Sequence, residues 1–105
     1  MSNLGATFRG KAVVEAATSV TIYNKSIPTA NTEVSQALAT GTKRFTIKLR
    51  GIAKLQLAFV STESGTKYIT IHPGAVYSEN DLNFGGTLYF QASRDSQTAE
   101  IIEWS

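Results

Sequence analysis

Four short runs in which apolar and polar residues alternate constrain the fold of this chain more than any other feature. They cover residues 45–49, 55–59, 68–72 and 87–91. In the first run, a period of two places Phe45, Ile47 and Leu49 on one face of a strand. The opposite face then carries Arg44, Thr46, Lys48 and Arg50. Strands buried on one side only predict a small all-β barrel or sandwich.

Turn signals separate these runs and define further strands. The signals are Arg50-Gly51, residues 61–65, Pro73-Gly74, Gly85-Gly86 and residues 94–96. Residues 12–23 alternate weakly, and Val20, Ile22 and Tyr23 are expected to enter a strand before residues 24–26 turn the chain. Further strands are expected at 76–78 and 98–104. About eight evenly spaced strands favour a jelly-roll-like β-sandwich, although spacing alone leaves an immunoglobulin-like topology open.

Residues 31–40 fit two structures. As a helix, the segment has Asn31 as its cap and Gly41 as its stop. As a strand, it points Val34 and Leu38 inward, with an irregularity between them. We favour the strand, because the Thr and Ser content suits it and the rest of the chain offers no helical layer to join.

Length and composition predict one domain preceded by an arm. The 105 residues suffice for a single core, expected over residues 12–105, whereas residues 1–11 hold too few apolar side chains to form an element of their own. The chain has no cysteine, so disulfides and thiolate metal sites are excluded. Its start lacks the basic and apolar stretches of a signal peptide, and no apolar run could span a bilayer. We therefore expect synthesis in the cytoplasm and no contact with membranes.

Positive charge is concentrated in the first half of the chain. Residues 1–50 contain seven Lys or Arg and two acids, whereas residues 51–105 contain three Lys or Arg and six acids. Arg44, Lys48 and Arg50 are expected to share the outer face of one strand and to form a basic stripe. Such a stripe could meet an acidic partner, but we favour a solvated strand face or an edge charged against aggregation.

Catalytic and metal-binding patterns are weak. His72 is the single histidine and is expected at the surface or in a structural role. Glu79 and Asp81 could offer oxygens to calcium, but they lack the carboxylate count of a calcium loop. Glu100 and Glu103 are three residues apart on one strand, so they are expected to face opposite sides and not to form a glycosidase pair. The sequence predicts no enzyme, no cofactor and no metal site.

Aromatic residues could form either a ligand platform or part of the core. Each occurs beside apolar strand residues, which favours burial in the core or at an interface over sugar or base stacking. These residues are Tyr23, Tyr68, Tyr77, Tyr89 and Trp104. Trp104 lies so close to the last residue that it must pack on its own sheet or dock on another subunit.

The order of strand and turn patterns over residues 32–104 resembles that of small structural proteins of tailed bacteriophage particles. The segments that carry the resemblance are Thr32-Glu33-Val34-Ser35, Gly41-Thr42-Lys43-Arg44-Phe45, Leu49-Arg50, Ala58-Phe59-Val60, Gly65-Thr66-Lys67-Tyr68, Pro73-Gly74, Tyr77-Ser78-Glu79, Thr87-Leu88-Tyr89-Phe90-Gln91 and Glu100-Ile101-Ile102-Glu103-Trp104. These are structural patterns and not chemical signatures. The resemblance implies a non-enzymatic virion component of β-sandwich type, such as a decoration or cement protein on the capsid.

The leading hypothesis is therefore a capsid accessory protein that binds the major capsid protein or other virion proteins and self-associates as a homo-oligomer, without specific nucleic-acid binding. The residues expected to contact partners are Phe8, Arg9, Lys11, Arg44, Lys48, Arg50 and Trp104. Two alternatives stay open: a carbohydrate-binding module for host attachment, and a head-to-tail connector or tail protein. Exposed aromatic rings would favour the carbohydrate-binding module, whereas buried ones would favour the capsid protein.

Overall fold

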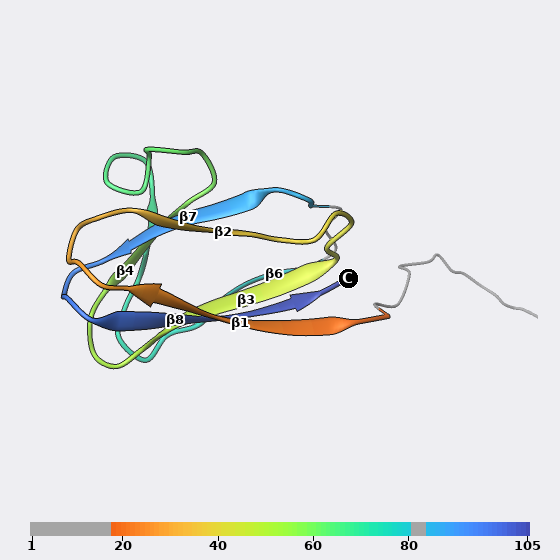
Figure 1. Cartoon of the computed structure of the whole chain (residues 1–105), viewed down its shortest axis with the longest axis horizontal. Helices are drawn as coiled ribbons and strands as arrows, with labels where there is room; N and C mark the ends of the chain where they lie inside the picture. The colour runs from red at the N-terminus through yellow and green to blue at the C-terminus, as the bar shows by residue number, and fades with distance from the viewer. Residues whose placement is uncertain (1–17, 81–83) are drawn as a thin grey trace, which may run out of the picture.

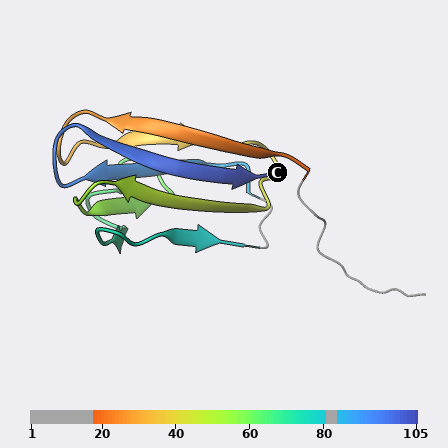
Figure 2. The ribbon, with the colours of Figure 1, turned by 90° about the horizontal axis from the view of Figure 1, so that it is seen from below.

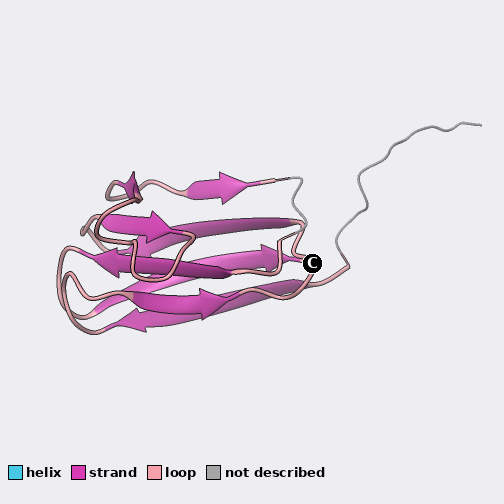
Figure 3. Ribbon diagram, turned by 90° about the horizontal axis from the view of Figure 1, so that it is seen from above, coloured by secondary structure: helices cyan, strands magenta, loops and turns pink. Residues whose placement is uncertain are grey.

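The computed structural model describes residues 18–80 and 84–105, and all regular elements in this part of the chain are β-strands (Figures 1 and 3). In chain order the strands are β1 (Val20–Ile27), β2 (Val34–Ala37), β3 (Arg44–Arg50), β4 (Leu55–Ala58), β5 (Ile69–Ile71), β6 (Tyr77–Glu79), β7 (Thr87–Ala92) and β8 (Gln97–Trp104). Within the same ranges, no helix has the length and apolar content that crossing a bilayer demands.

The strands form two antiparallel four-stranded sheets that pack face to face (Figure 1). One sheet, here the β1 sheet, has the order β1-β8-β3-β6, and the other, the β2 sheet, has the order β2-β7-β4-β5. The pairs β1·β8, β2·β7, β3·β6 and β4·β5 are those of one long antiparallel hairpin, rolled up so that its successive pairs fall in alternate sheets. This is the jelly-roll arrangement. The predicted jelly-roll-like sandwich is confirmed, and the immunoglobulin-like alternative is not observed.

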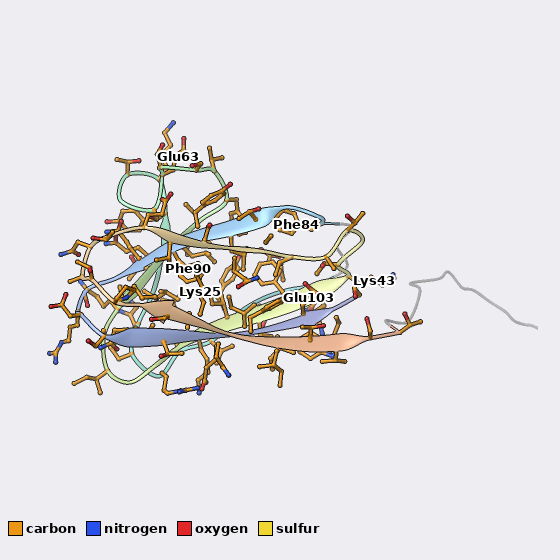
Figure 4. All side chains as sticks on the ribbon, viewed as in Figure 1. Lys25, Lys43, Glu63, Phe84, Phe90 and Glu103 are labelled. Carbon is orange, nitrogen blue, oxygen red and sulfur yellow. The ribbon has the colours of Figure 1, made fainter. Side chains whose placement is uncertain are left out.

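The core lies between the two sheets. Phe45, Ile47 and Leu49 of β3 are buried, as the period-two pattern predicted. From the opposite sheet, β7 contributes Leu88, Phe90 and Ala92, and Figure 4 shows Phe90 between the layers. A fully buried aromatic or aliphatic side chain stabilises the fold by roughly 1.5–3 kcal/mol relative to exposure, so this apolar layer supplies the main driving force for folding.

The ambiguous segment 31–40 contains the strand that we favoured. It forms β2, in which Val34 packs against the core, and Leu38 just beyond β2 is buried. Asn31 does not cap a helix but has a positive φ of 55°, a conformation that Asn tolerates better than most residues.

Pro73-Gly74, which connects β5 to β6, is the expected tight turn: Ala75 N–H donates to the carbonyl of His72, and Gly74 has φ of 81°. That combination defines a type II turn, which needs glycine in its third position.

The prediction for the first strand was wrong at its end. Residues Asn24–Ser26 do not turn the chain but lie within β1, opposite residues 98–100 of β8. The low strand propensity of Asn, Lys and Ser is overridden by two long-range effects. The ladder to β8 continues through these residues, and Ile27 at the end of the strand is fully buried.

Candidate partner-binding surface

The predicted basic stripe lies on the outer face of the β1 sheet. Arg44, Lys48 and Arg50 are exposed, and Figure 2 looks onto the sheet that carries them, with β1 in orange at one edge and β6 in teal at the other. Their common face is the one that the alternation predicted. Each of the three cations, however, contacts a side chain of the neighbouring strand β8.

Glu100 of β8 holds two of the three cations. Its carboxylate lies 2.8 Å from Arg50 Nε and 3.6 Å from Lys48 Nζ. The hydrogen bond from Arg50, together with the two positive charges, lowers the pKa of Glu100 below its usual value. The stripe is therefore partly neutralised within its own sheet. Exposed pairs of this kind contribute little to folding, so their main effect is on the charge that the surface presents.

Arg44 stacks on Trp104 at the other end of the same face. Its guanidinium carbon lies 3.9 Å from the centroid of the indole ring, and the register places the two residues directly opposite each other on β3 and β8. Such cation–π stacking holds both side chains against the sheet. Trp104 thus packs on its own sheet, where it is half-buried.

Apolar side chains lie beside Trp104 on the β1 side of this stack. The register aligns Val20 with Trp104 in one row and Ile22 with Ile102 in the next. Val20 is 58% exposed and Ile22 is 64% exposed. We call Val20, Ile22, Ile102 and Trp104 the outer apolar patch. Sequence reasoning did not find it, because the four residues meet only when β1 pairs with β8 in this register.

The outer face of the β2 sheet is different, because the loop between β4 and β5 folds back over part of it (Figure 1). Ser64 of this loop is fully buried, and its hydroxyl lies 2.6 Å from Glu33 and 3.1 Å from Gln91 of β7. Glu33 also accepts backbone N–H groups from Thr62 and Ser64. These bonds, led by that from the Ser64 hydroxyl, lower the pKa of Glu33. The β2 sheet is thus partly covered by its own chain.

The side chain of Glu103 points into the sandwich. Glu103 is 2% exposed and lies between the layers in Figure 4, where its Oε1 accepts hydrogen bonds from Tyr23 OH at 2.9 Å and from Ala39 N–H at 2.8 Å. Burial and the bond to Glu103 raise the pKa of Tyr23. Glu100 lies on the opposite side of the same strand, as predicted, so the two acids do not form a catalytic pair.

The remaining aromatic residues fall into two groups. Tyr23 and Tyr77 pack against the core, and Tyr77 OH donates to Glu79. Burial is the main cause that raises the pKa of Tyr77 to about 12, and the bond to Glu79 adds to it. Tyr68 is exposed and Tyr89 is half-buried. Core packing is therefore confirmed for Tyr23 and Tyr77 alone.

Several predicted residues lie outside the described part of the chain. Phe8, Arg9 and Lys11 belong to residues 1–17, and Asp81 of the possible calcium loop belongs to residues 81–83. His72 is at the surface. Among the residues that are described, no three His, Cys, Asp or Glu side chains come together as a metal site.

Comparisons with known proteins give one structural likeness. No protein-family model matches the chain, and no curated protein matches it either. A solved structure described as Bacillus endospore appendages, a novel family of disulfide-linked pili, aligns with 94% of this chain and 98% of its own. The two share 13% sequence identity with a TM-score of 0.43, a level at which the likeness does not bear on function.

Proposed function

We propose that this chain is a non-enzymatic structural protein of a tailed bacteriophage virion, and that it decorates the capsid by binding the major capsid protein. One observation carries the proposal: the outer face of the β1 sheet presents an exposed apolar patch with Arg44 stacked on Trp104. Tryptophan and arginine beside exposed aliphatic side chains are the residues that most often dominate protein–protein binding energy. The strand and turn order over residues 32–104, which resembles small phage structural proteins, supports the virion as the setting.

The division of this face suits a repetitive protein lattice. Its apolar end can bury surface against a partner, while its other end carries Lys48 and Arg50 around the single acid Glu100, leaving excess positive charge for an acidic partner. Many identical copies on one shell add weak contacts through multivalency. A sandwich with one face that can bind a partner is therefore suited to such a lattice.

The contacts of Trp104 and Tyr77 favour a protein partner over a sugar at these two side chains. A sugar-binding platform needs an aromatic face open to the ligand, but Arg44 covers the indole of Trp104. Tyr77 packs against the core, and its hydroxyl is bonded to Glu79. A glycan would have to displace these contacts before stacking.

Co-sedimentation with capsids tests the proposal. The purified chain is mixed with emptied capsids from the phage that encodes it, after the native copies have been stripped. We expect the wild type and Thr70→Ala, an exposed control on the β2 sheet, to sediment with the shells. Arg44→Ala and Trp104→Ala should bind at least tenfold more weakly while keeping a cooperative thermal transition. Equal binding by all four proteins, or none by the wild type, would contradict the proposal.

A further inference from the structure

β1 differs from the other sheet edges in its length. The edge strands of the two sheets are β1, β6, β2 and β5, and β1 has eight residues whereas the other three have three or four. A long edge strand offers a row of backbone donors and acceptors to another strand, and proteins normally shorten or block such edges. Figure 2 shows β1 running the full length of its sheet at the margin.

The hydrogen bonds at the start of β1 identify which backbone groups face outward. Ser19 N–H donates to the carbonyl of Ser105 at 2.9 Å, and Ser105 N–H donates to the carbonyl of Ser19 at 3.0 Å. In an antiparallel ladder such pairs recur at every second residue, so Thr21, Tyr23, Lys25 and Ile27 bond to β8. The N–H and C=O groups of Val20, Ile22, Asn24 and Ser26 therefore point away from the sheet. In the described part of the chain no strand pairs with them.

The side chains of these same residues do not protect the edge. Val20, Ile22, Asn24 and Ser26 are all exposed and uncharged, and Lys25 has the opposite orientation along the strand. Pro28 follows the strand and does not interrupt it. Charged residues or prolines on an edge strand are the usual barriers to pairing, and β1 has one such residue, Lys25, on the same face as Tyr23 and four positions from Thr21.

We propose that β1 is the seam of a homodimer, in which two copies of β1 pair antiparallel about a two-fold axis at Thr21 and join two β1 sheets into one eight-stranded sheet. A second copy is the occupant that this edge fits, because a two-fold axis at Thr21 lets the outward N–H and C=O groups of Val20 pair with those of Ile22 in both directions. The register follows from the side chains: an axis at Thr21 places Val20 opposite Ile22 of the other copy. β-Branched residues such as Val and Ile pack well against cross-strand neighbours, so this register stabilises the joined sheet.

This arrangement has consistent electrostatic and surface consequences. With the axis at Thr21, the two Lys25 residues lie eight positions apart along the strand, about 26 Å, so their charges barely interact. The two outer apolar patches become neighbours on one side of the joined sheet and stay accessible. The dimer would thus double the face that we propose for capsid binding, but the inference concerns the isolated chain and does not require the capsid.

Cysteine cross-linking tests the seam, because the natural chain has no cysteine. The two Thr21 residues would form a non-hydrogen-bonded pair with Cα atoms about 4.5 Å apart, within disulfide range. Thr21→Cys should therefore oxidise to a covalent dimer at low micromolar concentration. Ser26→Cys is the matched control, because its two copies would be about 33 Å apart. Cross-linking of Ser26→Cys as fast as Thr21→Cys would overturn the register, and with it the proposal.

Analytical ultracentrifugation tests the role of the backbone. Ile22→Pro removes an outward N–H without breaking the ladder to β8, whereas Ile22→Ala shortens the same side chain and keeps the N–H. We expect the wild type to be dimeric, and the proline variant to dissociate at a concentration at least tenfold higher than the alanine variant. A monomeric wild type at 100 µM, or equal dissociation of the two variants with intact thermal transitions, would overturn the proposal. Either result leaves the capsid-binding test unaffected, since no capsid is present.

Discussion

The hydrogen bonds to Glu103 should account for a measurable part of the stability of the sandwich. Glu103 belongs to β8, Tyr23 to the neighbouring strand β1, and Ala39 to the connection that leads from the β2 sheet back to the β1 sheet. One buried carboxyl oxygen therefore ties together three segments that are far apart in the sequence. Replacing Glu103 by leucine removes both bonds at once.

The expected size of the effect follows from the two bonds. Each hydrogen bond contributes about 1–1.5 kcal/mol net, so Glu103→Leu should lower the free energy of unfolding by about 2–3 kcal/mol. Tyr23→Phe removes one of the bonds and should cost about 1–1.5 kcal/mol. Once Glu103 is leucine, the Tyr23 hydroxyl has lost its partner. The double variant should then be about 1 kcal/mol more stable than the sum of the single losses predicts.

Urea denaturation of the four proteins measures this coupling. With a slope near 2 kcal/mol per molar urea, Glu103→Leu should move the midpoint down by about 1–1.5 M. Glu103→Gln is the control, because its amide oxygen can accept both bonds and should cost less than about 1 kcal/mol. Additive losses within about 0.3 kcal/mol, or equal destabilisation by leucine and glutamine, would refute this account of Glu103.

Three further predictions concern titrating and charged groups. The folded-state pKa of Glu33 is lowered, so its contribution to stability is present above the pKa of the unfolded chain, near 4.5, and is lost as the pH falls through the folded-state value. Ser64→Ala should reduce this loss of stability in denaturation curves at pH 2–6. A pH profile that does not change in the variant would contradict the prediction. Tyr77, with a pKa of about 12, stabilises the fold below pH 10, and this contribution is lost as the pH rises from 10 towards 12. In a titration followed by absorbance at 295 nm, Tyr77→Phe should remove one tyrosine that ionises at high pH. An unchanged titration curve would refute the raised pKa of Tyr77. Glu100→Gln should free Lys48 and Arg50 from their ion pairs and strengthen capsid binding at low salt. The gain should vanish near 1 M salt, because the screening length there falls to about 3 Å. A gain that is independent of salt would exclude an electrostatic cause.

The fold was largely predictable because its signal is local. Alternation along β3 and β7 identifies inward residues such as Phe45 and Phe90, and β7 begins directly after the Gly85-Gly86 signal. The even spacing of eight strands favoured the jelly roll. The end of β1 was missed, because residues 24–26 carry turn-forming side chains and their strand conformation comes from pairing with β8, more than seventy positions away.

The surface was only partly predictable, because it depends on register. The sequence predicted that Arg44, Lys48 and Arg50 share a face. It did not predict their contacts with β8, in which Glu100 pairs with Lys48 and Arg50 and Trp104 stacks under Arg44. Likewise, Val20 and Ile22 read as ordinary strand residues until the β1·β8 register places them beside Ile102 and Trp104. Contacts between strands distant in sequence leave no local pattern, so they emerge only from the structure.

Cryo-electron microscopy of particles of the phage that encodes this chain tests the central claim most directly. The account predicts density for the sandwich repeated across the capsid lattice, with the outer face of the β1 sheet against the major capsid protein. Density confined to the tail or its vertex, or particles that lack the chain altogether, would contradict a decoration role.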